Sequence, residues 1–254
     1  MLDRNFLQNL AVKSETSFQN IIREYIQHLF LRSFYTKRGC ENFLFKGGTA
    51  LRIVFGSPRF SEDLDFTGVG RSRDYERVLE KTLLDLSNEG IKIDLTESKP
   101  TSGGHLANMI VNLFEEKVEI QNQISFREND PLHPPSREAD SEASERNGEN
   151  IVVTTSLAPS YSIYLLGRAI LVSEKIKALI ERAKPRDFFD LYFILRKEEL
   201  RKVLKVEGIQ REKILNRIES QKRGHLEREL KELLPKSFWQ VISDLPAALK
   251  KEFV

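Results

Sequence analysis

The chain has 254 residues, of which 40% are apolar and 31% charged, and its net charge is +2; this is enough material for two modest domains. No stretch is apolar for long enough to span a membrane or to form a signal peptide, so we expect a cytoplasmic protein without a membrane partner. Cys40 is the only cysteine, which excludes an intrachain disulfide, and the four histidines lack the spacing of a zinc site.

Charge is distributed unevenly along the chain. Residues 1–166 carry 19 Lys and Arg against 24 Asp and Glu, whereas residues 167–254 carry 21 against 14. A basic C-terminal part would suit a polyanionic partner such as RNA. The same asymmetry would arise if Lys and Arg only solvate helix faces, and the sequence leaves both interpretations open.

The first predicted helix has an apolar stripe that runs from Phe18 to Phe30, and Ser14 is placed to cap it. A short apolar run at 42–45 has the length of a strand. Gly47 and Gly48 follow it, and apolar residues then recur at helical spacing, so the glycines lie where a strand turns into a helix. Glycines let a phosphate approach the main chain closely, and the start of a helix favours an anion. The turn is therefore a candidate phosphate site.

Two acids follow the glycine turn. Asp63 and Asp65 flank Leu64 in a short run with apolar edges, and side chains at positions i and i+2 of a strand project from the same face. Carboxylates that converge repel each other unless a cation lies between them, and Mg²⁺ takes oxygen ligands from carboxylates and phosphates. The pair is a candidate magnesium site.

Helical and strand patterns alternate in the middle of the chain. Residues 75–86 predict an amphipathic helix that ends near Gly90, the segments 91–95, 108–114 and 117–120 predict strands, and Gly103-Gly104 predicts a turn. Apolar residues almost vanish from 128 to 150, which predicts a flexible loop, with an interdomain linker as the alternative. Strand character resumes at 151–155. We therefore predict an α/β domain over residues 1–166.

From Gly167 onward the pattern is helical, and we predict a helical-bundle domain over residues 167–254. Helices are expected at 169–180, 188–195, 198–205, 211–223, 226–234 and 238–253, the last of them broken at Pro246. The first of these helices carries Lys175. The charged residues that follow it are Arg182, Lys184, Arg186, Asp187 and Asp190, and the two acids are spaced to share one helix face.

Two parts of the chain match the pattern of a known family. K-G-G-T-A-L-R at 46–52 and R-F-S-E-D-L-D-F at 59–66 resemble the first motif of the AbiEii/AbiGii toxin family. E-K-I-K-A-L at 174–179 and R-A-K-P-R-D-F-F-D-L at 182–191 resemble its second motif. These are the nucleotidyltransferase toxins of type IV toxin–antitoxin systems, with the MenT toxins among their relatives, and they belong to the DNA polymerase beta-like nucleotidyltransferase superfamily. The resemblance covers roughly residues 40–195.

The resemblance implies a fold and a set of site residues. The fold is α/β, with a polymerase-beta-like mixed sheet followed by the helical C-terminal domain. Mg²⁺ would be held by Asp63, Asp65 and a third carboxylate, Glu119, with Asp94 as the alternative. The implied catalytic residues are Asp63, Asp65, Lys175 and Asp190. The implied nucleotide-binding residues are Gly47, Gly48, Thr49, Arg59, Ser61, Lys175, Arg186 and Asp187.

The resemblance also implies a function. We expect Mg²⁺-dependent transfer of a nucleoside monophosphate from an NTP to RNA, at the tRNA 3′ end, and a cognate antitoxin as partner. Transfer to a protein target, and nucleotide or RNA binding without turnover, remain open as alternatives. Asp190 could hold the base or ribose, orient Lys175 or help to deprotonate the attacking hydroxyl. Alternatively, Asp187 and Asp190 could belong to a structural ion-pair network with Arg182 and Arg186.

Overall fold

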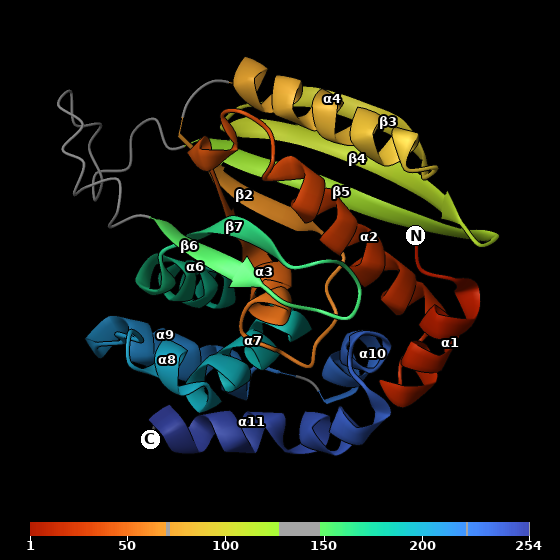
Figure 1. The fold of residues 1–254 in the computed structure, drawn as a ribbon. Coiled ribbons are helices and arrows are strands. Elements are labelled where there is room, and N and C mark those ends of the chain that lie inside the picture. The colour runs from red at the N-terminus through yellow and green to blue at the C-terminus, as the bar shows by residue number, and fades with distance from the viewer. Residues whose placement is uncertain (70–71, 127–147, 222, 254) are drawn as a thin grey trace, which may run out of the picture.

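A mixed β-sheet with helices on both faces forms the centre of the protein (Figure 1). The computed structural model describes residues 1–69, 72–126, 148–221 and 223–253. Within them the sheet has seven strands in the order β3-β4-β5-β2-β1-β7-β6. The strands are β1 Phe43–Lys46, β2 Leu64–Gly68, β3 Lys92–Thr101, β4 Gly104–Leu113, β5 Glu116–Phe126, β6 Gly148–Val153 and β7 Tyr161–Leu166. The predicted α/β class with a mixed sheet is confirmed.

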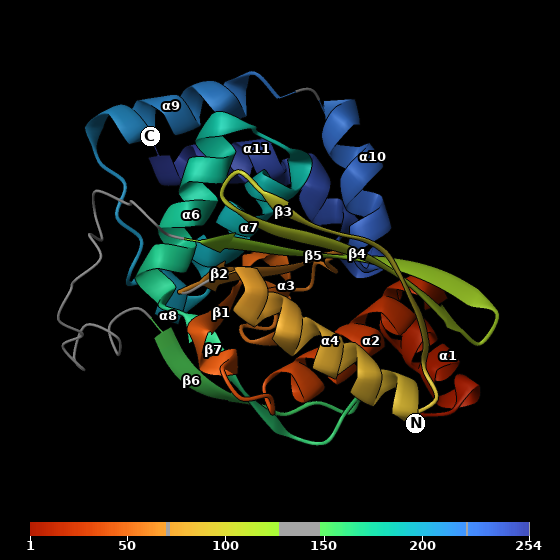
Figure 2. The ribbon, with the colours of Figure 1, turned by 90° about the horizontal axis from the view of Figure 1, so that it is seen from above.

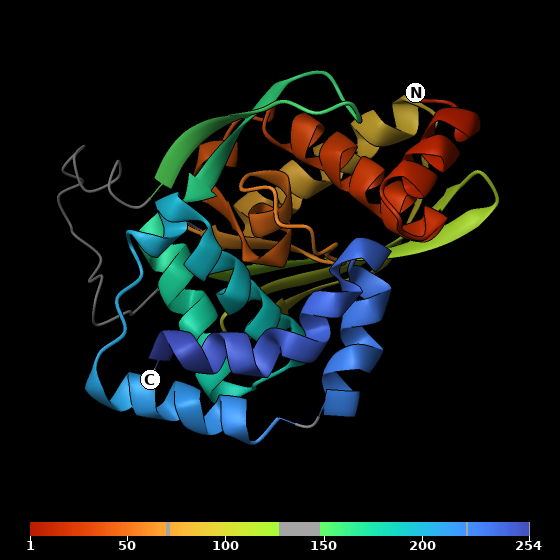
Figure 3. The ribbon, with the colours of Figure 1, turned by 90° about the horizontal axis from the view of Figure 1, so that it is seen from below.

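Helices of the N-terminal half cover one face of this sheet, and helices of the C-terminal half lie on the other side (Figure 2). The first group is α1 Arg4–Lys13, α2 Phe18–Phe34, α3 Gly47–Ile53 and α4 Ser72–Asn88. The second group is α6 Arg168–Glu181, α7 Pro185–Arg196, α8 Glu198–Arg201, α9 Gly208–Glu219, α10 Arg223–Leu233 and α11 Trp239–Phe253. Figure 3 shows this second group from below.

The middle of the sheet carries the glycine turn and the acid pair. β2 pairs antiparallel with β1 on one side and parallel with β5 on the other. Lys46, the last residue of β1, lies directly opposite Asp65 of β2. The chain turns at Gly47 into α3 and returns as β2, so the turn and the two acids are brought to the same end of this strand pair.

Aromatic packing fixes α2 and α4 on the sheet. Phe34 of α2 stacks on Phe66 of β2 with ring centroids 5.0 Å apart, and it also contacts Phe43 and Tyr75. All four rings are buried. A fully buried ring of this size contributes roughly 1.5–3 kcal/mol relative to an exposed one, so this cluster holds the strand that carries Asp65 against the helical layer.

The N-terminal helices differ from the sequence prediction at their caps. The apolar stripe does form α2, but Ser17 caps it by accepting a hydrogen bond from Asn20 N at 3.2 Å. Ser14, the predicted cap, instead ends α1. The prediction missed α1 because only Leu7 and Ala11 of that helix are buried, which leaves too narrow an apolar stripe to stand out.

Several strands also depart from the prediction. The hairpins formed by β3, β4 and β5 extend well beyond the apolar runs, because β3 is exposed along most of its length and β5 alternates buried residues with partly or fully exposed ones. β7, which lies beside β1, was not predicted. Residues 148–150 form the start of β6 and are not part of a loop. The remainder of the predicted loop, 128–147, lies outside the described residues.

The C-terminal helices pack around a second apolar cluster, formed by buried residues between Ile176 and Phe253. α6 contributes Leu171 and Val172 to the main core and Ile176 and Leu179 to this cluster. The predicted domain boundary after residue 166 falls just before this shared helix. α8 is shorter than predicted, and α11 continues through Pro246 without a break. Burial of Leu245 and Leu249 on either side of Pro246 offsets the hydrogen bond lost at the proline. No described helix is long and apolar enough to cross a membrane.

Candidate active site

The glycine turn packs against the acids of β2 with no room for a side chain. Gly47 has φ +83°, in the left-handed region, and a Cβ added there would overlap Asp65 Oδ2. A Cβ on Gly48 would overlap the Arg59 guanidinium and lie 2.8 Å from Ser61 Oγ. The two glycines therefore let the turn approach both Asp65 and Ser61.

Asp63 and Asp65 lie where β2 begins, and both carboxylates are in an unfavourable setting for charge. Burial, and then the charge of Asp65, raise the pKa of Asp63 to about 6. Burial also raises the pKa of Asp65, although the positive charges of Lys175 and Lys46 oppose that shift. The protein thus keeps two adjacent carboxylates whose charges it does not fully compensate.

Thr49 supports Asp63 through the backbone. Its side chain is fully buried, and its hydroxyl donates a hydrogen bond to the main-chain carbonyl of Asp63. The hydroxyl is therefore engaged inside the fold, and the predicted role of Thr49 in nucleotide binding stays a prediction. Thr49 instead ties α3 to the segment that presents the acids.

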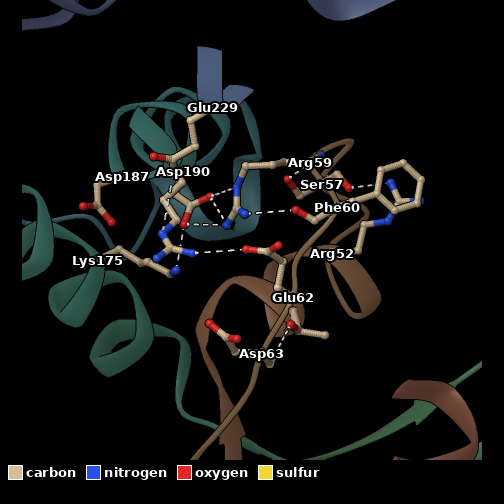
Figure 4. A network of polar contacts seen from close by, with 12 residues as sticks. Arg52, Ser57, Arg59, Phe60, Glu62, Asp63, Lys175, Asp187, Asp190 and Glu229 are labelled. Atoms are coloured by element: carbon tan, nitrogen blue, oxygen red, sulfur yellow. Dashed lines mark hydrogen bonds and ion pairs between the residues drawn. The ribbon is translucent and has the colours of Figure 1, made fainter. Parts of the chain in front are cut away.

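Arg59, Asp190 and Lys175 form one buried ion-pair cluster (Figure 4). Arg59 Nε lies 2.9 Å from Asp190 Oδ1, and Nη2 lies 3.1 Å from Oδ2. Lys175 Nζ donates to the same Oδ2 at 2.7 Å. Arg59 is 2% exposed and Asp190 is 1% exposed, so the two side chains bind each other inside the fold. The role of Arg59 in nucleotide binding stays a prediction, and the contact of Asp190 with Lys175 fits the orienting role among its predicted alternatives.

The neighbouring positive charges favour the ionised form of Asp190 over the protonated form. Burial by itself would raise the pKa of Asp190, but the charges of Arg59 and Lys175 outweigh burial and lower it. The side chain of Lys175 is 12% exposed, and its charge also acts on Asp65. Asp190 therefore fixes the position of Lys175, a cation of the second motif whose charge reaches Asp65.

Asp187 and Arg186 have separate partners. Asp187 is buried, accepts hydrogen bonds from Arg182 Nη2 at 2.7 Å and from Lys184 N at 3.0 Å, and so caps α7. The contact with Arg182 is the ion pair that the structural alternative predicted, and the role of Asp187 in nucleotide binding stays a prediction. Arg186 lies within 4.0 Å of Glu62 and 3.8 Å of Glu229. It clamps neither Asp187 nor Asp190.

Neither candidate for the third carboxylate joins the acid pair. Asp65 is opposite Gln123 on β5, and Glu119 lies four residues earlier on that strand, roughly 13 Å away at the rise of an extended chain. The side chain of Glu119 is 76% exposed and lies 3.8 Å from Lys117. Asp94 is on β3, beyond β4. Within the described part of the chain, no group of three His, Cys, Asp or Glu residues could hold a metal ion.

Two basic residues at the site were not predicted. Lys46 Nζ lies 2.9 Å from Ser125 Oγ and 3.2 Å from Glu174, beside Asp65. Arg23 of α2 lines a cleft together with Asp63. Lys46 opens the first motif, which was a usable signal. No sequence signal marked Arg23, because a charged residue on the solvated side of an amphipathic helix looks the same in the sequence.

A glycine turn that faces two carboxylates across a strand pair, with a lysine beside them, is an arrangement suited to a nucleotidyltransferase. The chain belongs to the nucleotidyl transferase AbiEii toxin family of type IV toxin–antitoxin systems, whose family model matches residues 29–251. It is therefore a nucleotidyltransferase of that toxin family.

Solved structures share the fold. JHP933 from Helicobacter pylori is 18% identical, with a TM-score of 0.54 over 94% of each chain. MenT4, a nucleotidyltransferase toxin from Mycobacterium tuberculosis, is 16% identical, with a TM-score of 0.62 over 98% of this chain and 90% of that one. Among curated proteins, none matches the chain.

Proposed function

We propose that the protein transfers a nucleoside monophosphate from an NTP to a hydroxyl of RNA, at the 3′ end of a tRNA. The observation that carries this proposal is the convergence of Gly47, Asp65 and Lys175 from three separate segments. The excess of Lys and Arg over Asp and Glu in residues 167–254, 21 against 14, supports a polyanionic acceptor.

The phosphates of the NTP bind at the glycine turn. The main-chain amides of Gly47 and Gly48 would donate hydrogen bonds to the phosphates. The hydroxyl of Ser61 would be a further donor, since Ser61 Oγ lies 2.8 Å from the space that a Gly48 side chain would fill. Lys175 adds a point charge whose position Asp190 fixes. These residues orient the phosphates and neutralise charge, which is most of what catalysis of phosphoryl transfer requires.

Asp63 and Asp65 fit a Mg²⁺ site. Two adjacent carboxylates with raised pKa values are under strain that a divalent cation relieves, and Mg²⁺ commonly takes one or two carboxylates together with substrate phosphates. When bound, the metal supplies positive charge to the phosphates at the reacting centre. A third protein carboxylate is unnecessary in this arrangement.

The reaction is a single displacement at the α-phosphorus. The acceptor oxygen forms a bond to that phosphorus, the bond to the oxygen bridging the α- and β-phosphates breaks, and pyrophosphate leaves while the hydroxyl proton passes to water. The family also implies a cognate antitoxin. We place the protein in the cytoplasm, where NTPs and tRNA occur together.

Incubation with each α-³²P-labelled NTP and Mg²⁺, with and without total tRNA, tests the proposal. We expect label on tRNA with wild-type protein and none with Asp65→Ala, or when EDTA replaces Mg²⁺. Label on a protein instead of tRNA would refute the RNA acceptor, and full activity of Asp65→Ala would refute the metal site.

A further inference from the structure

A polar cleft opens on the side of Asp63 that faces away from the glycine turn. It has a volume of about 420 Å³ and is lined by Arg23, Asp63, Asn108, Ile110 and Gln121, with Glu62 and Glu119 at its walls. This volume falls within the range of small-ligand sites, roughly 300–1,000 Å³. None of the predicted functions used Arg23, Asn108 or Gln121.

The cleft exists because β2 is much shorter than β5. β5 pairs with β4 from Glu116 onward, but β2 begins only opposite Asn122. The stretch of β5 before Asn122 therefore leaves a notch in the sheet beside Asp63. The notch brings Asn108 and Ile110 of β4 and Gln121 of β5 into one cleft with Asp63.

The floor of the cleft is a fixed chain of amides. Asn108 Nδ2 donates to Glu97 Oε2 at 2.8 Å, so its Oδ1 is turned to accept a hydrogen bond from Gln121 Nε2 at 3.0 Å. This leaves Gln121 Oε1 and one of its N–H groups available. An acceptor and a donor side by side match the hydrogen-bonding edge of a nucleobase, and Ile110 adds an apolar surface.

One wall of the cleft holds the side chain of Arg23. Its Nη1 donates to Asn20 Oδ1 at 3.1 Å, its Nε is buried without a hydrogen-bond partner, and it forms no ion pair in the described part of the chain, although its charge acts on Asp63. Both acids at the walls have cations nearby, Arg186 for Glu62 and Lys117 for Glu119. The guanidinium of Arg23 is thus the group in the cleft best able to take a phosphate.

The strand order assigns this cleft to the acceptor. The glycine turn lies on the β1 side of β2, whereas the cleft lies on its β5 side. In-line displacement places the attacking oxygen and the leaving pyrophosphate on opposite sides of the α-phosphorus. The step rests on the proposed function, which puts the triphosphate at the glycine turn.

We propose that the cleft binds the 3′-terminal nucleotide of a single-stranded RNA acceptor. The base pairs with the free amide edge of Gln121, the phosphate binds Arg23, and the ribose hydroxyl points to Asp63. Selectivity for the acceptor then resides in β4, β5 and α2, apart from the residues that hold the NTP.

Fluorescence anisotropy tests this assignment without turnover. The probe is a fluorescein-labelled oligoribonucleotide that ends in the CCA sequence of tRNA, and no NTP is present. We compare Arg23→Gln and Asn108→Ala with two matched controls, Arg77→Ala on exposed α4 and Asn112→Ala further along β4. Urea denaturation verifies that each variant is folded.

We expect wild-type protein to bind the probe. Arg23→Gln and Asn108→Ala should weaken binding by about tenfold, the value of one hydrogen bond to a charged or oriented group, while both controls stay close to wild type. Absence of binding by the wild type, or equal affinity of all four variants, would overturn the assignment. If the wild-type protein labels tRNA but Arg23→Gln and Asn108→Ala bind the oligoribonucleotide as tightly as wild type, the assignment of the cleft is refuted and the proposed activity stands. If the two variants bind the oligoribonucleotide more weakly but the wild-type protein transfers no label, the proposed activity is refuted and the cleft assignment stands.

Discussion

Arg59 and Asp190 meet in a buried, two-point ion pair although 131 residues separate them in the chain. The pair joins the segment before the acids to α7, and Lys175 completes it through the shared Asp190 oxygen. The ion pair therefore couples the stability of the fold to the position of the lysine that faces Asp65.

Asp190→Ala should destabilise the protein by about 3–5 kcal/mol, because it leaves Arg59 buried without a counter-ion. Urea denaturation measures the change. Glu181→Ala is the matched control, since its ion pair with Lys177 is exposed on α6 and such pairs are worth about 1 kcal/mol or less. Similar losses in the two variants would contradict the structural importance of the buried pair.

Lys175→Ala should lower the rate of nucleotidyl transfer by about a hundredfold, the usual effect of removing one preorganised group that stabilises developing charge. Lys177→Ala, two residues along the same helix and 74% exposed, should retain activity. Initial rates with labelled NTP provide the measurement. Equal rates in the two variants would show that Lys175 does not act on the substrate.

Gly47→Ala should abolish nucleotidyl transfer. It should also lower the free energy of unfolding by more than backbone strain alone would. Gly56→Ala isolates that strain, since Gly56 also has a positive φ, +76°, but no atom within 4 Å of an added Cβ. Strain alone costs about 1–2 kcal/mol, whereas the Gly47 methyl group must also displace the Asp65 carboxylate. Thermal unfolding and transfer assays distinguish the two variants. An active Gly47→Ala protein would argue against the close approach of the turn to Asp65.

Asp63 should make the metal-free protein less stable as pH rises from about 4 to about 6. Its folded-state pKa, about 6, exceeds the ordinary value of 3.8, so the folded state binds the proton more tightly and this stabilisation is lost as Asp63 ionises. Asp63→Asn should therefore be more stable than wild type at about pH 7 and similar at about pH 4. Denaturation in EDTA measures both.

Magnesium supplies the complementary control. Added Mg²⁺ at neutral pH should stabilise wild-type protein, because the ion binds the folded acid pair, and should leave Asp63→Asn almost unchanged. A variant that shows the wild-type pH profile in EDTA would exclude Asp63 as the titrating group.

The sequence was most informative where a local pattern determines the structure. The glycine turn and the acid pair could be predicted because strand alternation and the approach to a helix both depend on neighbouring residues. Lys175 was found through its motif. The prediction of its catalytic role is untested by the fold and remains a prediction.

Properties that depend on distant partners could not be predicted. Arg59 lies in the same motif as Ser61, yet its side chain is buried by α7, and Thr49 binds the carbonyl of Asp63. Glu119 was named through the family resemblance, but the register of β5 with β2 places Gln123 opposite Asp65. Register arises from the whole sheet and leaves no mark on a single strand.

Phe60 N donates a backbone hydrogen bond of 2.8 Å to Leu233 O, at the end of α10. The segment that presents the acids is thus secured by a helix that the ribosome makes long after that segment. A nascent chain that has emerged only as far as β7 lacks Lys175, Asp190 and this contact. Nucleotidyl transfer would therefore begin only after α10 has been synthesised and has packed against this segment, which keeps the nascent chain inactive until then.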